Sequence, residues 1–199
     1  MYIMSHQGLS ISELIKEIKK DIEEFDGKLN IYKGKYCGGE SKCSGLFYLD
    51  NNESPILKIA KGSNPEQWVG ILIHEYCHFL QWRDNSKAWR TFAEGCASFD
   101  DLMLNPAKYK KEIIDLISLE LDCEKKTARI IKANNYFDIN IYIKNANAIL
   151  LKYVYLYYNN KWPSNFSKFK KVQDKCPAKL LKSSSDYLNI DKNILSIFN

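Results

Sequence analysis

The chain has 199 residues, of which 45% are hydrophobic and 27% charged, and its formal net charge at pH 7 is +5. This composition excludes a disordered chain, and no apolar run approaches the roughly 20 residues that a membrane-spanning helix needs. The length suits one substantial hydrophobic core, so we expect a single domain over residues 1–199. The lysines are scattered along the chain rather than gathered in a stripe, which gives no support to nucleic-acid binding.

The N-terminus and the cysteines both bear on the compartment. The opening residues MYIMSHQGLS lack a basic segment followed by an apolar core, so no secretory signal is visible. The six cysteines form no C-x-x-C pair, and three of them lie at apolar positions of expected helices. We therefore expect reduced thiols in a cytoplasmic protein. Cys37 and Cys43 flank a glycine-rich loop and are an alternative, second metal site, although no second pair completes it.

Residues 1–64 are predicted to form a helix followed by a small sheet. Apolar residues recur at helical spacing from Leu9 to Phe25, and Ser10 and Glu13 are spaced as a capping box. Three short segments separated by turn residues follow, and they are predicted to be strands: Leu29–Tyr32, Leu46–Asp50 and Ile56–Ala60. The second and third are close enough to form a hairpin.

The next predicted helix, from Asn64 to about Trp82, is apolar nearly all round, which is typical of a helix buried in a core. At its centre lies the pattern H-E-x-x-H, formed by His74, Glu75 and His78. Four residues apart on a helix, the two imidazoles share one face and can reach one metal ion, with Glu75 beside them. A metal site explains two buried histidines and a glutamate better than satisfied core histidines do.

Beyond Trp82 the pattern favours further helices over residues 87–104, 106–133 and 139–158. After these the periodicity fades, and we expect residues 159–199 to form an irregular arm. The expected domain thus consists of residues 1–64, a helical metal-site region over 65–158, and this arm.

The order of helix, small sheet and H-E-x-x-H helix resembles the zincin metallopeptidases. The resemblance implies a mostly helical α+β fold with a small N-terminal sheet, antiparallel or mixed, packed beside the H-E-x-x-H helix. In that family the edge strand nearest the active-site helix holds the substrate in extended form. Ile56–Ala60 is the candidate for that role, the alternative being an ordinary edge strand.

A catalytic zinc site needs three protein ligands and one open position for water. No histidine follows His78, so the third ligand is expected to be a carboxylate. Glu94 lies in FAEGCASF, which looks like the segment that carries the zinc glutamate in large aminopeptidases of this class, although it lies closer to His78 than there. Glu120 lies in ELDCE, which resembles the E-x-x-x-D/E element of gluzincins, where the second carboxylate orients a ligand histidine.

Helical geometry favours Glu120 over Glu94. At about 100° per residue, Glu120 and Glu124 both point along the apolar stripe of the predicted helix 106–133, whereas Glu94 shares its side with polar residues. Two carboxylates within an apolar stripe need a cation or protons. We therefore predict Glu120 as the third ligand, with Glu94, Glu124 or another group as alternatives. If Glu120 is the ligand, Glu124 is expected to accept a hydrogen bond from His74 or His78.

These residues predict a zinc-dependent peptidase of the gluzincin type, similar to compact cytosolic or phage-encoded metallopeptidases, which act on peptide or protein substrates. Zn²⁺ would activate a bound water molecule, and Glu75 would be the general base. A tyrosine of the helix at 139–158 is expected to stabilise the oxyanion, and the sequence does not choose among several. One alternative is a non-catalytic binding or regulatory module on a zincin scaffold. Another is a nucleic-acid-linked protease, which the absence of a basic stripe disfavours.

Overall fold

The computed structural model describes residues 8–37, 43–62, 64–95, 98–163 and 166–199. Two compact units make up the chain, one formed by Met1–Asp84 with Lys126–Ile139 and the other by Asn85–Lys125 with Asn140–Asn199. Helix α5 (Lys110–Asn134) belongs in part to each unit. The residues that bear on a secretory signal, 1–7, and most of the glycine-rich loop, 38–42, lie outside the described residues.

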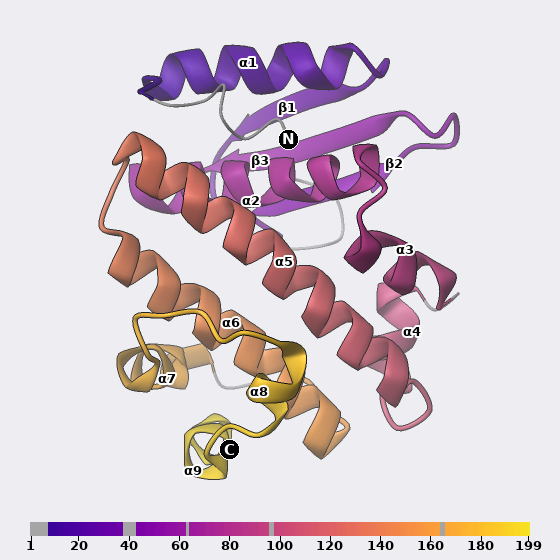
Figure 1. Cartoon of the computed structure of the whole chain (residues 1–199), viewed down its shortest axis with the longest axis vertical. Helices are drawn as coiled ribbons and strands as arrows, with labels where there is room; N and C mark the ends of the chain where they lie inside the picture. Colours follow the sequence, from indigo (N-terminus) through magenta and orange to yellow (C-terminus); the bar gives the residue numbers. More distant parts are fainter. Residues whose placement is uncertain (1–7, 38–42, 63, 96–97, 164–165) are drawn as a thin grey trace. The chain divides into compact units, whose positions relative to one another are not determined.

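The first unit holds a three-stranded mixed sheet and the H-E-x-x-H helix (Figure 1). Its elements are α1 (Ile11–Glu23), β1 (Lys28–Lys33), β2 (Gly45–Leu49), β3 (Pro55–Lys61) and α2 (Pro65–Arg83). The predicted hairpin of β2 and β3 is confirmed, since these strands pair antiparallel. Helix α1 packs on β1, and α2 packs on β2 and β3. The chain is therefore α+β, mostly helical with a small mixed sheet beside α2.

The strand order is β1-β3-β2, which corrects the expectation that Ile56–Ala60 forms an edge. Ile59 is paired with Ile31 of β1 on one side, and Leu57 with Phe47 of β2 on the other. β3 is therefore neither a substrate-binding edge strand nor an ordinary edge strand, because its backbone is hydrogen-bonded to a neighbouring strand on each side. The sequence pattern predicts that β3 is a strand. It does not show that β1 pairs with β3 in parallel, on the side opposite β2.

Helices α1 and α2 begin where the sequence predicts. Ser10 and Glu13 form the capping box of α1. The Asn64 side chain accepts hydrogen bonds from the backbone N–H groups of Glu66 and Gln67, and Pro65 occupies the first turn. Much of α2 is buried, as its apolar circumference predicts. Within the first unit, the backbone N–H of Leu9 donates a hydrogen bond to Asn134 Oδ1 at 2.9 Å. This bond joins the C-terminus of α5 to the residues just before α1.

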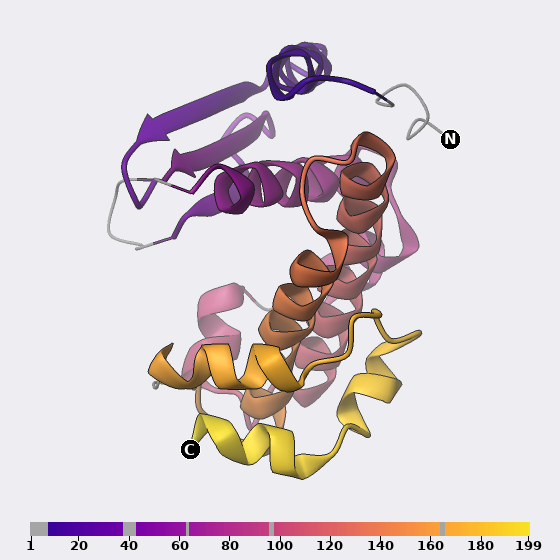
Figure 2. The ribbon, with the colours of Figure 1, turned by 90° about the vertical axis from the view of Figure 1, so that its left-hand side faces the viewer.

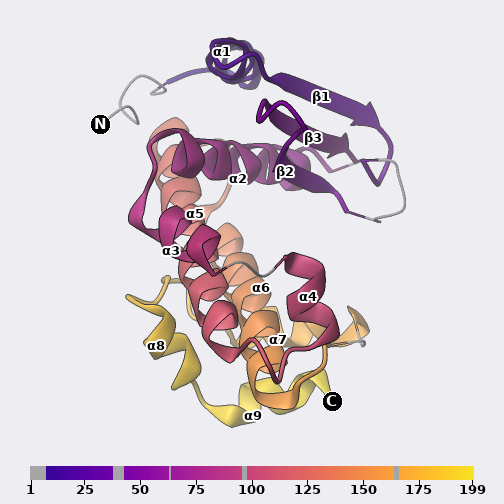
Figure 3. The ribbon, with the colours of Figure 1, turned by 90° about the vertical axis from the view of Figure 1, so that its right-hand side faces the viewer.

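The second unit is helical. It contains α3 (Lys87–Glu94), α4 (Phe99–Leu104), the first part of α5 and nearly all of α6 (Ile139–Asn159), as Figure 3 shows. The single helix expected over 87–104 is divided, because Ser98 and Asp101 form a capping box that begins a new helix. The helix predicted from residue 106 begins later, at Lys110, and the helix predicted over 139–158 is α6.

The C-terminal segment differs from the irregular arm that we expected, because it forms short helices (Figure 2). These are η2 (Phe166–Lys168), α7 (Phe169–Lys175), α8 (Ser184–Leu188), α9 (Lys192–Leu195) and η3 (Ser196–Phe198). Polar contacts hold them to α6: Tyr187 donates a hydrogen bond to the buried Asn147, and Tyr155 donates to Asn199 Oδ1 at 2.6 Å. Helices of so few residues leave little periodicity in a sequence.

A hydrophobic core cluster lies in this second unit, where apolar residues of α5 and α6 meet those of the short C-terminal helices. Among the described residues, no helix combines the length and the apolar character needed to cross a membrane.

Candidate metal centre

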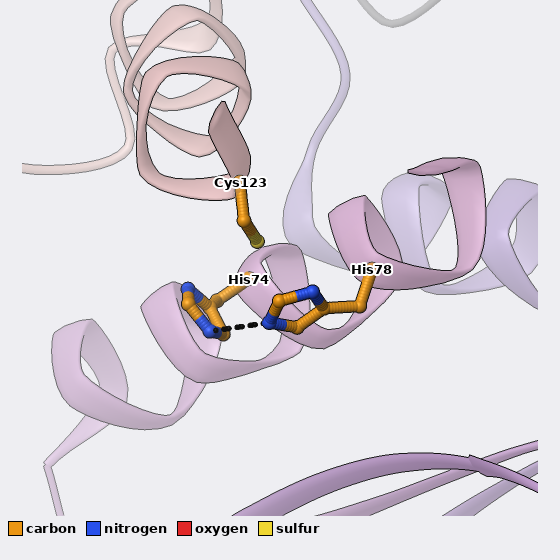
Figure 4. Close-up of side chains that lie close together, drawn as sticks. All are labelled: His74, His78 and Cys123. Carbon is orange, nitrogen blue, oxygen red and sulfur yellow. Dashed lines mark hydrogen bonds between the residues drawn. The ribbon is translucent and has the colours of Figure 1, made fainter. Parts of the chain in front are cut away.

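His74 and His78 lie one turn apart on α2 with their Nε2 atoms 3.1 Å from each other (Figure 4). Two nitrogens that bind one tetrahedral zinc ion at 2.0–2.1 Å are separated by about 3.3 Å, so this spacing already suits a shared ion. His78 is only 8% exposed, and His74 is half-buried. The helix therefore brings the two predicted ligands together, as their spacing of four residues requires.

The ring of His78 is oriented by Gln81, a residue that the sequence analysis did not select. Nδ1 of His78 lies 2.8 Å from Gln81 Oε1. A carbonyl oxygen can only accept, so Nδ1 carries the hydrogen and Nε2 of neutral His78 keeps its lone pair. That lone pair is the one a metal would take. Gln81 is fully buried, and its position one turn after His78 on the same helix was the available signal.

A third donor atom comes from Cys123 of α5. One ligand atom from each of His74, His78 and Cys123 lies within 4.8 Å of the others, and in Figure 4 the thiol points toward the two imidazoles. Nitrogen and thiolate sulfur are both donors that zinc accepts. These three residues could therefore hold a metal ion, whose identity the geometry does not specify. Cys123 lies in the apolar stripe of the predicted helix 106–133, and helical periodicity alone gives it no role as a ligand.

The predicted ligand Glu120 lies on α5 one turn before Cys123, and it is half-buried. Among the described residues, Glu120 does not belong to the group formed by His74, His78 and Cys123, and its role as a ligand stays a prediction. Glu94, the alternative, ends α3 and is exposed, as its polar helix face predicted.

Glu124 is almost fully buried, with 2% of its surface exposed, which confirms its predicted place in the apolar stripe of α5. Its carboxylate accepts a hydrogen bond from the hydroxyl of Tyr142 at the start of α6. The predicted bond from His74 or His78 to Glu124 is not tested by this contact. Tyr142 is thus one tyrosine of α6 that contacts α5, whereas Tyr155 and Tyr158 donate hydrogen bonds to Asn199 and Leu188 in the C-terminal segment.

Glu75, the candidate base, is half-buried and lies against the first residue of β2. A Cβ added to Gly45 would lie 2.7 Å from Glu75 Oε1 and 2.3 Å from Ile71 Cγ2. Only glycine leaves room there for the carboxylate. The strand that adjoins the candidate base is thus β2, an edge of the sheet among the described residues.

A cavity of about 380 Å³ lies in the first unit. Its lining includes Ser44 just before β2, and Trp68 and Ile71 on α2. Since Ile71 also lies against Gly45, the cavity adjoins the start of β2. It offers space for a side chain of a ligand beside this strand.

Comparison with known proteins does not assign the chain to a family. No protein-family model matches it, and neither the curated proteins nor the solved structures contain a match.

Proposed function

We propose that this protein is a zinc-dependent peptidase of the gluzincin type with a zincin-like fold, and that His74 and His78 bind the metal. The observation that carries the proposal is the pair of Nε2 atoms 3.1 Å apart on α2, with the His78 tautomer set by Gln81. A half-buried carboxylate, Glu75, lies on the helix between the two ligands. Two orientable imidazoles with an adjacent carboxylate are the parts that metal-assisted hydrolysis requires.

The third ligand is proposed to come from the turn of α5 that holds Glu120 and Cys123. The spatial grouping supports Cys123, and the sequence pattern supports Glu120. Either would leave a fourth position open, as catalytic zinc sites do. A thiolate donates more electron density to the metal than a carboxylate does, so the choice affects how strongly bound water is acidified.

In the proposed reaction, His74 and His78 would hold a zinc ion, which when bound would lower the pKa of a water molecule and polarise the scissile carbonyl. Glu75 accepts the proton of the attacking water and then delivers it to the leaving amine. The contact of Glu75 with the backbone of Gly45 keeps the carboxylate beside β2. An extended peptide added antiparallel to the outer edge of β2 would pass this carboxylate, which moves the role once expected of β3 to its neighbour.

The test compares Glu75→Gln with wild type. We expect wild type to bind about one zinc per chain and to cleave members of a quenched fluorescent peptide library. Glu75→Gln should keep its zinc and lose cleavage, because the metal ligands are intact and the base is absent. Glu66→Gln, on the exposed first turn of the same helix, is the matched control and should behave as wild type.

Undiminished cleavage by Glu75→Gln would sink the mechanism. Wild type that binds zinc but cleaves no peptide would favour the alternative, a non-catalytic binding or regulatory module. An absence of zinc binding in wild type would overturn the proposal as a whole.

A further inference from the structure

Cys37 and Cys43 face each other beside the sheet of the first unit. The backbone N–H of Cys37 donates to the carbonyl oxygen of Cys43 at 2.9 Å, and their side chains are also joined by a hydrogen bond. Both side chains are thiols, that of Cys37 buried and that of Cys43 half-exposed. Because both their backbones and their thiols are within hydrogen-bonding reach, a disulfide between them needs little backbone movement.

The surroundings of the pair connect it with Glu75. The Cys37 thiol donates to the carbonyl oxygen of Lys58 in β3 at 3.4 Å, which fixes it against the central strand. The carbonyl oxygen of Ser44, next to Cys43, accepts from the backbone N–H of Ala60 at 2.8 Å. Gly45, the following residue, is the one that contacts Glu75. A bond at Cys43 therefore acts on the chain that leads directly into the strand beside the candidate base.

We propose that Cys37 and Cys43 form a reversible disulfide when the protein meets a low-molecular-weight disulfide such as glutathione disulfide. Cys43, as its thiolate, attacks one sulfur of the reagent, forms a mixed disulfide and releases one glutathione. Cys37 then attacks Sγ of Cys43 and releases the second glutathione. Two protein thiols are oxidised to one disulfide, and one glutathione disulfide is reduced to two glutathione molecules, which take up the two protons.

The two cysteines have different roles in this exchange. Cys43 is the accessible thiol and meets the reagent first. Burial, and to a smaller degree Cys43 and Glu75, raises the pKa of the Cys37 thiol to about 11. A thiol of that pKa is a poor first nucleophile in neutral solution, but it lies next to the mixed disulfide and resolves it without diffusion. Cys77 and Cys176 also carry thiols, and both residues are buried.

The test is peptide mapping of the full chain after equilibration in glutathione buffers of increasing oxidised fraction. Samples are quenched with acid, alkylated with N-ethylmaleimide and digested with trypsin without reduction. Cleavage after Lys35, Lys42 and Lys58 separates the cysteines into the peptides 36–42 and 43–58. We expect the two alkylated peptides to be replaced by one disulfide-linked species as the buffer becomes oxidising, and to return on reduction.

Cys43→Ser should abolish the linked species, whereas the matched control Cys176→Ser, at a buried thiol of the second unit, should retain it. The peptide map of the wild-type protein shows whether the disulfide forms even if a variant folds poorly. Cys43 found only as its glutathione adduct, linked to another cysteine, or still alkylated in the most oxidising buffer would overturn the proposal. Because the readout is a covalent bond and not catalysis, its failure is distinguishable from failure of the proposed function.

Discussion

Gln81 accepts a hydrogen bond from Nδ1 of His78 at 2.8 Å, and this one contact decides which nitrogen of the ring can bind a metal. With Nδ1 protonated, Nε2 of His78 presents a lone pair toward Nε2 of His74, 3.1 Å away. A hydrogen bond between these two atoms takes its hydrogen from His74, which must give up that hydrogen to bind a metal through the same nitrogen. Gln81 thus orients the ring of His78 toward a metal shared with His74.

Replacement of Gln81 by methionine is expected to weaken zinc binding by about 10–100-fold, the usual effect of losing a group that orients a ligand histidine. Methionine has a similar length but lacks the carbonyl acceptor. Gln81→Glu keeps an acceptor and should retain most of the affinity. Competition with a chelator of known affinity measures the effect, and Gln67→Met on the exposed start of α2 is the control. Equal affinity of Gln81→Met and wild type would contradict this role.

The third ligand can be decided by zinc content and by cobalt spectra. If Cys123 binds the metal, Cys123→Ala should lose zinc while Glu120→Ala keeps it, and the cobalt-loaded protein should show a thiolate charge-transfer band that Cys123→Ala lacks. The opposite pattern, with zinc lost from Glu120→Ala and no such band, would assign the carboxylate. Both substituted residues lie on one turn of α5. Circular dichroism of each variant checks that a loss of zinc does not come from a loss of folded structure.

Gly45→Ala is expected to lower peptidase activity and stability together. The added methyl would meet Glu75 Oε1 at 2.7 Å and Ile71 Cγ2 at 2.3 Å, so one of the two side chains must move. Overpacking of this kind costs about 1–3 kcal/mol. Denaturant unfolding and peptide cleavage measure the two effects. Gly62→Ala should be near neutral, because a Cβ there meets nothing within 4 Å, and an equally neutral Gly45→Ala would refute the close contact.

The alkaline stability of the protein should depend in part on Cys176. Burial raises the pKa of this thiol from its ordinary value near 9.0 to about 11. A raised pKa means that the folded state holds the proton more tightly, so the stabilisation is complete below pH 9 and is lost as the pH rises toward 11. Unfolding curves at pH 8 and pH 10.5 should show a smaller decline for Cys176→Ala than for wild type. Equal declines would show that the thiol titrates alike in both states.

The sequence determined those parts of the protein that depend on local spacing. His74 and His78 share a helix face because they are four residues apart, and the caps Ser10 and Asn64 begin their helices because side-chain oxygens satisfy free backbone N–H groups. The burial of Glu124 followed from helical periodicity. Each of these relationships involves residues within a few positions of one another.

Tertiary structure alone decided the relationships between residues far apart in the chain. Periodicity identifies β3 as a strand, but only the pairing of Leu57 with Phe47 and of Ile59 with Ile31 makes it central and leaves β2 beside Glu75. The grouping of Cys123 with the two histidines and the contact of Gly45 with Glu75 likewise depend on packing. A repeating pattern along the chain specifies which face of an element is buried, whereas the neighbour that covers this face depends on how the elements pack together.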